Sequence, residues 1–147
     1  MPVITTLAHP QTTVSFADAT VADAMSRGVI NCTPDTTLRG VARLMAAYGV
    51  HAVFVFDYGE EADETTRLAA VVSDLDLVAA AWAGIDERTA GESAIAPLVT
   101  VSCDDRLELA AELMTQHGVS HLAVIDARSH RPVGVLSTLD IARIVAR

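Results

Sequence analysis

Two stretches of the chain carry the same stripe of apolar residues, spaced at i, i+3, i+4 and i+7 as on one face of a helix. The stripe residues are Leu38, Val41, Ala42 and Met45 in the first stretch and Leu107, Ala110, Ala111 and Met114 in the second. Each stretch is followed by a glycine, Gly49 or Gly118, and glycine suits the left-handed position that ends a helix. The pattern predicts two equivalent helices, 69 positions apart.

Segments rich in β-branched and apolar residues flank both helices and predict strands. The predicted strands are 29–30, 52–56 and 68–72 in the first copy and 99–101, 122–125 and 132–136 in the second. A further helix follows the last strand of each copy directly, over 74–83 and 138–146. Each copy therefore contains a strand, a helix, two strands and a second helix.

The chain is thus an internal repeat with a short extension before it. Thr20 opens the first copy and Thr89 opens the second. The copies keep one offset as far as Asp57 and Asp126, after which a longer loop in the first copy shortens the offset to 64. The acidic run of that loop, residues 60–64, is more typical of a solvated hairpin tip than of a partner site. We predict an extension at 1–19, a first repeat at 20–84 and a second repeat at 85–147.

A repeat of about 60 residues would not bury its apolar faces well alone. We therefore expect an α+β fold in which the two repeats pack with pseudo-two-fold symmetry around one shared core. The composition suits a packed protein, since 51% of the residues are hydrophobic and 20% are charged. A chain of 147 residues leaves no room for an ordinary catalytic domain beside the repeats.

The charge of the chain limits its partners. The formal net charge is −9 and the sequence pI is about 4.8, which disfavours nucleic acid and anionic membranes because both require a basic face. All ten basic residues are arginine, which excludes the lysine of Schiff-base chemistry and of a P-loop. No apolar run is long enough to span a bilayer, and the first 19 residues do not resemble a secretory signal. We expect a cytoplasmic protein in which Cys32 and Cys103 are reduced thiols.

A Ser-x-x-Asp sequence follows the last predicted strand of each copy and opens the next helix, from Ser73 to Asp76 and from Ser137 to Asp140. Such a sequence is close to a capping box, in which both side chains bind free backbone N–H groups. The same residues also suit a ligand, because a helix N-terminus attracts phosphate, a serine hydroxyl donates to a phosphate oxygen and a carboxylate accepts from ribose hydroxyls. Gly134 is expected to let a ligand approach the backbone closely.

The remaining reactive side chains do not form a recognisable site. His117 and His121 are four positions apart, but Gly118 ends the predicted helix between them, so they do not share the helical face that zinc would require. The chain also lacks a nucleophile elbow and a glycine-rich oxyanion loop. The sequence therefore predicts neither a metal site nor an enzyme.

The arrangement of the repeated motifs resembles the CBS domain family, and the resemblance extends from Thr20 to Arg147. The family signature is a glycine, two apolar residues, a Ser or Thr, two variable residues and an aspartate. Residues 134–140 fit this signature in full, whereas residues 70–76 have alanine in place of the glycine. A second family feature is a helix-ending glycine followed by an apolar residue and a strand, as at Gly49 and Gly118.

The resemblance implies a non-enzymatic sensor that binds AMP, ADP, ATP, an NAD-type compound or S-adenosylmethionine in clefts between the two repeats. One implied site consists of Ser137, Asp140, Val135, Gly28, Val50 and His51. The pseudosymmetric site consists of Ser73, Asp76, Val71, Pro97, Val119 and Ser120. Arg143 lies one helical turn beyond Asp140 and is expected to reach a phosphate, whereas its counterpart is Ala79. We therefore rank the Ser137/Asp140 site first, and we expect a triphosphate to suit this acidic chain less well than a smaller or uncharged ligand.

The resemblance also implies a homodimer, because CBS pairs commonly associate through helices. The predicted helices at 77–83 and 141–146 have alanine-rich faces, which permit close packing. We expect ligand binding to alter how the dimer, or a regulated protein that the sequence does not identify, is engaged. The alternative is a dimerisation or scaffold module that binds no ligand.

Overall fold

The computed structural model describes residues 14–57, 67–85, 87–93 and 98–147, and the structural statements below concern these residues. The acidic run at 60–64 and the predicted site residue Pro97 lie outside the described residues. The described chain divides into two compact units. Unit 1 is formed by the continuous segment from Ile30 to Leu98, whereas unit 2 combines the segment that ends at Val29 with Val99–Arg147.

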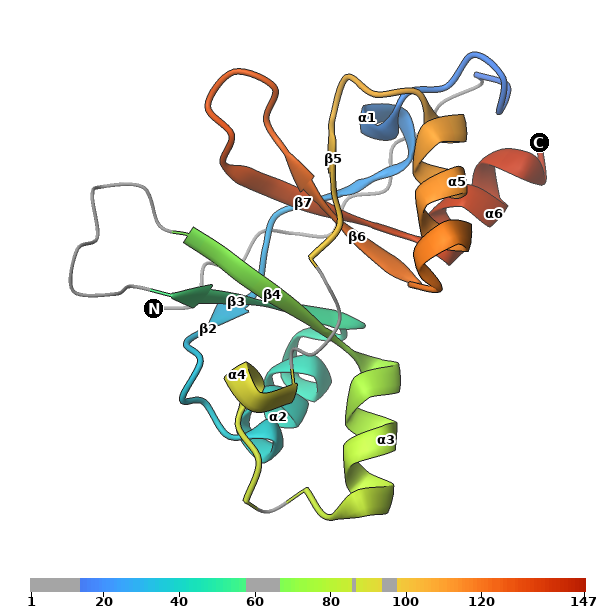
Figure 1. The fold of residues 1–147 in the computed structure, drawn as a ribbon. Helices are drawn as coiled ribbons and strands as arrows, with labels where there is room; N and C mark the ends of the chain where they lie inside the picture. Colours follow the sequence, from blue (N-terminus) through green and yellow to red (C-terminus); the bar gives the residue numbers. More distant parts are fainter. Residues whose placement is uncertain (1–13, 58–66, 86, 94–97) are drawn as a thin grey trace. The chain divides into compact units, whose positions relative to one another are not determined.

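Unit 1 is a three-stranded sheet with helices α2 and α3 packed against each other (Figure 1). Its elements are β2 (Asn31–Cys32), α2 (Leu38–Tyr48), β3 (Ala52–Asp57), β4 (Arg67–Ser73), α3 (Asp74–Ala83) and α4 (Ala90–Ser93). The sheet order is β2-β3-β4, in which β2 runs parallel and β4 antiparallel to the central β3.

Unit 2 repeats this plan and adds one short strand at the sheet edge (Figure 1). Its elements are α1 (Val21–Ala24), β1 (Ser26–Arg27), β5 (Thr100–Ser102), α5 (Leu107–His117), β6 (His121–Ile125), β7 (Pro132–Ser137) and α6 (Thr138–Val145). The sheet order is β1-β7-β6-β5, with β5 parallel to β6 and the other neighbours antiparallel.

The predicted α+β class and the order strand, helix, strand, strand, helix are confirmed in both units. Helices α2 and α5 end where the glycines predicted, because Gly49 and Gly118 adopt positive φ angles of 63° and 62°. Strand β2 lies two residues later than the predicted run at 29–30. The short elements α1, β1 and α4 were not predicted. Helix α1 and strand β1 form part of unit 2, and helix α4 forms part of unit 1.

The segments that lead into the two repeats are exchanged between the units. The first leading segment (residues 19–27) lies at the start of repeat 1 in the sequence but docks on unit 2, where the N–H of Val21 donates to the carbonyl of Asp105 at 2.8 Å. The second leading segment (residues 88–93) lies at the start of repeat 2 in the sequence but docks on unit 1. There the N–H of Ala90, the counterpart of Val21, donates to the carbonyl of Thr36 at 2.8 Å.

The exchanged segments also supply hydrogen-bond acceptors to the N-termini of the long helices. The first N–H groups of a helix have no acceptor inside the helix. The first N–H of α5, at Leu107, donates to the carbonyl of Ala19 at 2.9 Å. The first N–H of α2, at Leu38, donates to the carbonyl of Arg88 at 2.9 Å. Each leading segment therefore docks on the unit that contains the rest of the other repeat, through equivalent hydrogen bonds.

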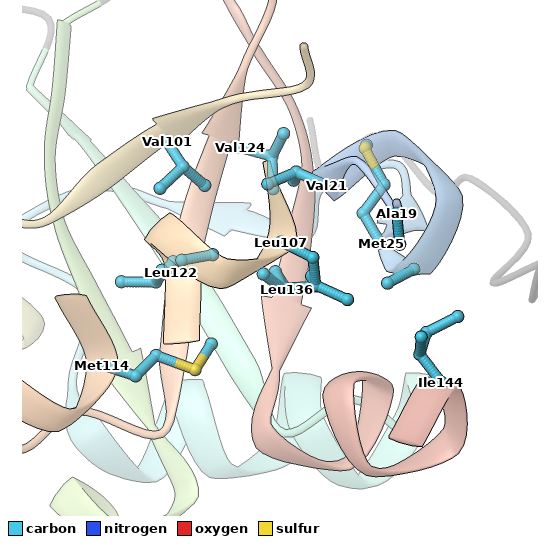
Figure 2. Packing of buried hydrophobic residues seen from close by; sticks show 12 residues of the cluster. Ala19, Val21, Met25, Val101, Leu107, Met114, Leu122, Val124, Leu136 and Ile144 are labelled. Carbon is cyan, nitrogen blue, oxygen red and sulfur yellow. The ribbon is translucent and has the colours of Figure 1, made fainter. Parts of the chain in front are cut away.

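Each unit has its own cluster of buried apolar side chains, and the expectation of one core shared by the two repeats stays a prediction. In unit 2, Figure 2 shows side chains from the sheet gathered with those of α5 and of the first leading segment. The central members of this cluster are Ala19, Val21, Met25, Val101, Leu107, Met114, Leu122, Val124, Leu136 and Ile144. The exchanged helices contribute to these clusters, since Val21 of α1 is fully buried in that of unit 2 and Ala90 of α4 in that of unit 1.

No helix in the described part of the chain is long and apolar enough to cross a membrane. Cys32 and Cys103 are free thiols. Cys32 lies in β2 and is buried in the core of unit 1, and this burial raises the pKa of its thiol.

Candidate functional site

The repeated Ser-x-x-Asp motif lies where the last strand of each unit turns directly into a helix. Strand β4 ends at Ser73, and α3 begins at the next residue. The backbone N–H and the hydroxyl of Ser73 both donate to Oδ2 of Asp76, at 2.8 and 3.0 Å. The N–H of Asp76 in turn donates to the Ser73 hydroxyl oxygen at 3.3 Å. The first motif is therefore a closed capping box.

The second motif has the same geometry and a further cation. The N–H of Ser137 donates to Oδ2 of Asp140 at 2.8 Å, and the N–H of Asp140 donates to the Ser137 hydroxyl oxygen at 3.2 Å. Asp140 is only 4% exposed, and its Oδ1 accepts a hydrogen bond from Nη1 of Arg143 at 3.4 Å. Arg143 is 44% exposed, so the arginine predicted to meet a phosphate lies at the edge of the motif.

Capping by a serine or threonine with an acid three residues later is widespread in this protein. Thr89 with Glu92 at α4 makes the same reciprocal contacts as the two motifs, and at α1 the N–H and the hydroxyl of Thr20 both donate to Asp23. The capping interpretation of Ser73 and Ser137 is therefore confirmed. Hydrogen bonding alone does not distinguish these two motifs from the other caps. Any inference that they bind a ligand must therefore come from their position directly after a hairpin strand.

Gly134 has a structural role, and the expectation that it makes room for a ligand was wrong. Strand β1 pairs with β7 so that Arg27 lies opposite Gly134. A Cβ atom at position 134 would collide with the carbonyl oxygen of Ser26 and with the side chain of Met25. The space beside this glycine is thus filled by β1, which explains why the signature is complete in the second copy.

Replacing Gly134 by alanine is expected to lower the free energy of unfolding by about 3 kcal/mol, because β1 must move away from β7 to admit the methyl group. Urea unfolding followed by circular dichroism measures the change. The matched control is Ala70→Gly at the same motif position of β4, where we expect a loss of about 1 kcal/mol at most. Equal stability of Gly134→Ala and the native chain would contradict the pairing of β1 with β7.

The residues that follow the helix-ending glycines lie beside the motif of their own unit. In unit 1, the N–H of Asp74 donates to the carbonyl of His51 at 2.9 Å, and Nδ1 of His51 lies 2.9 Å from Oδ2 of Asp74. In unit 2, the N–H of Thr138 donates to the carbonyl of Ser120 at 3.0 Å. The sequence analysis did not identify Asp74 as a residue of the site. Its position directly after Ser73, at the start of the helix, was the signal that could have identified it.

The structure brings several predicted site residues together within each unit. In unit 2, the described site residues are Ser137, Asp140, Arg143, Val135, Gly28, Val119 and Ser120. Gly28 lies beside β7, since its N–H donates to the carbonyl of Val133 at 2.9 Å. In unit 1, they are Ser73, Asp76, Val71, Val50 and His51. The predicted grouping of the Ser137 motif with His51, and of the Ser73 motif with Ser120, stays a prediction.

Within the described ranges, three or more His, Cys, Asp or Glu side chains nowhere gather in a way that would hold a metal ion. The junctions instead offer backbone N–H groups, serine hydroxyls and carboxylates, which suit the phosphate, ribose and base of a nucleotide.

Comparison with known proteins relates the whole repeat region to one family. Residues 21–83 and 93–147 match the CBS domain. The solved structure of Hypoxic Response Protein I with two coordinated zinc ions is 28% identical, with a TM-score of 0.66 over 85% of this chain and 98% of that one. A CBS domain protein from Pyrobaculum aerophilum complexed with AMP is 25% identical, with a TM-score of 0.70 over 87% of this chain and 98% of that one.

A curated relative is much longer. The homoserine O-acetyltransferase of Methanosphaerula palustris is 28% identical over 136 residues, which are 90% of this chain but 25% of that protein. The chain thus spans about a quarter of the length of the curated relative that it matches.

Proposed function

This chain belongs to the CBS domain family, and on that premise we propose that it is a regulatory module that binds an adenine nucleotide or a related adenosyl compound. The observation that carries the proposal is the repeated junction of hairpin strand, Ser-x-x-Asp motif and helix, present at Ser73 and again at Ser137. Two junctions with the same serine–aspartate cap are expected of a ligand-binding repeat, whereas a capping role alone does not require them to recur after the same strand.

The ligand class follows from the groups at these junctions. Each helix N-terminus offers positive partial charge to a phosphate, and each aspartate offers acceptors to ribose hydroxyls. The AMP complex of the related CBS domain protein from Pyrobaculum aerophilum supports an adenosyl ligand. The net charge of −9 favours a monophosphate or an uncharged adenosyl compound over a triphosphate.

A regulatory role, rather than catalysis, is proposed for the matched region. The acetyltransferase activity named for the longer relative is not carried over, because this chain matches only a quarter of that protein. The regulated partner stays unidentified, and a cytoplasmic location stays a prediction.

Isothermal titration of the purified protein with AMP, ADP, ATP, NAD and S-adenosylmethionine tests the proposal. Saturable heat with at least one of these compounds is the expected result and defines the ligand. No heat with any of them would favour the alternative, a dimerisation or scaffold module in which Ser137 and Asp140 serve only as a helix cap.

Helix α3 carries an exposed apolar stripe that supports a homodimer. Leu75 and Val78 are each 65% exposed and Trp82 is 94% exposed, and their i, i+3, i+7 spacing places them on one face. The opposite face is already used, since Ala80 and Leu77 pack in the core of unit 1. An aromatic residue and two aliphatic residues left together on one helix face are typical of a protein–protein contact. We propose that a second copy of the chain covers this stripe.

Val78→Arg is expected to weaken the homodimer at least about tenfold, because the contact would then bury an unpaired charge. Sedimentation velocity over a range of concentrations measures the change, and the emission of Trp82, the only tryptophan, should shift to the red as the dimer dissociates. The control is Ala46→Arg on the exposed face of α2. A native chain that is monomeric at all concentrations, or a Val78→Arg dimer of native affinity, would refute this interface.

A further inference from the structure

The exposed apolar stripe of α3 has a counterpart with smaller side chains on α6. The corresponding positions, 64 residues later in the chain, are Leu139, Ala142 and Ala146. All three side chains are exposed, and Leu139 is 54% exposed. Alanine therefore occupies the positions where α3 has Val78 and Trp82. The two equivalent faces are both apolar, but α3 presents large side chains and α6 presents small ones.

The helices beside these two faces have opposite charges at a corresponding position. Helix α2 packs against α3, and α5 packs against α6 (Figure 1). Arg43 of α2 corresponds to Glu112 of α5, 69 residues later, and both side chains are exposed. Glu112 keeps its negative charge, since Gln116, which donates to its Oε1 at 3.0 Å, is neutral. Glu108, one turn earlier on α5, is exposed as well and adds a second carboxylate to the same face.

These differences make the helix surface of each unit complementary to that of the other unit. A two-fold contact between identical units brings the same surface of both copies together. Such a contact would oppose arginine to arginine on α2, or glutamate to glutamate on α5, and like charges at a contact lower the affinity. A contact between different units instead opposes the arginine to the glutamates, and it opposes the large side chains of α3 to the alanines of α6.

Resting on the homodimer proposed above, we propose that unit 1 of one copy binds unit 2 of the other copy. The α3 stripe packs against Leu139, Ala142 and Ala146 of the second copy, and Arg43 lies opposite the partner's Glu112. Two-fold symmetry repeats this contact, so each copy contributes both of its surfaces. The homodimer is then head-to-tail, and the difference between the two repeats determines this arrangement.

The test reverses one charge at a time and then both. Glu112→Arg and Arg43→Glu are each expected to weaken the homodimer about tenfold at low salt, because each variant opposes charges of the same sign in both copies of the contact. The double variant Arg43→Glu/Glu112→Arg opposes unlike charges again and should recover most of the lost affinity. The control Ala46→Arg adds an arginine to α2 without reversing its charge and should bind no more weakly than the native chain. Sedimentation velocity over a range of concentrations measures the affinities.

The outcomes separate this inference from the homodimer itself. A contact between identical units opposes like charges before and after each single substitution. A native dimer whose affinity is the same in both single variants would therefore overturn the head-to-tail arrangement and leave the homodimer intact. A double variant that associates more weakly than either single variant would overturn the arrangement as well. A native chain that is monomeric at all concentrations would refute the homodimer, and the arrangement with it.

Discussion

Asp140→Ala is expected to reduce the affinity for AMP at least about 100-fold, because the substitution removes a charged acceptor for two ribose hydroxyls, each worth about 1.5–3 kcal/mol. Asp140 is the stronger choice of the two motif aspartates, since it is nearly buried and held by both Ser137 and Arg143. A fixed carboxylate loses little conformational entropy when a ligand binds. Isothermal titration with AMP measures the loss.

The matched control for this experiment is another capping acid. Asp23 caps α1 through the same contact as Asp140, with the N–H of Thr20 donating to its Oδ2 at 2.9 Å. Asp23→Ala should therefore cost a similar amount of stability, about 1 kcal/mol, without affecting AMP. If both variants bind AMP as the native chain does, Asp140 is a helix cap and nothing more. Saturable binding lost only in Asp140→Ala would establish the site.

Val21→Asp is expected to destabilise unit 2 by about 3 kcal/mol or more, although Val21 opens the first repeat, because the substitution buries an unpaired charge. Val21 is fully buried in the core of unit 2. The counterpart Ala90→Asp should instead destabilise unit 1, where Ala90 is fully buried. Amide hydrogen exchange, read element by element, distinguishes the two effects.

The pattern of lost protection is the decisive result. Val21→Asp should accelerate exchange in β5, α5 and β7, and Ala90→Asp should accelerate it in α2 and β3. Ala46→Asp, on an exposed position of α2, should change neither pattern. If Val21→Asp removed protection in unit 1 and Ala90→Asp removed it in unit 2, the exchange of leading segments would be contradicted.

The long elements were predictable because their signals are local. The helical stripe that begins at Leu38 and the glycine at position 49 fix α2 without reference to the rest of the chain. The leading helices α1 and α4 have four residues each, which is too short for a periodic pattern to appear. Their buried residues contact segments 54 to 84 positions away in the chain, Thr36 for Ala90 and Asp105 for Val21, and no local pattern reports such a partner.

The candidate site was likewise predictable where its signals are local in the sequence, and not where they depend on distant segments. The Ser-x-x-Asp motifs and Arg143 were identified from spacing alone, and the structure places Arg143 against Asp140. Gly134 was assigned to the wrong cause, because the neighbour that requires a glycine is β1, a strand that lies more than 100 positions earlier in the chain. Asp74 was overlooked because it lies between the two signature residues, where the family signature permits any residue.

The exchange of leading segments has a consequence for synthesis on the ribosome. Strand β1 pairs with β7, Ser26 opposite Val135. Of the described strands, β1 is therefore made first and waits roughly ten seconds, at ordinary elongation rates, until β7 has been made. Every described element of unit 1 is made within that interval. We therefore expect unit 1 to fold first, while Val21 and Met25 stay without the apolar partners that later enclose them. Because these apolar side chains stay exposed during that period, we expect the nascent chain to depend on molecular chaperones more than its small size suggests.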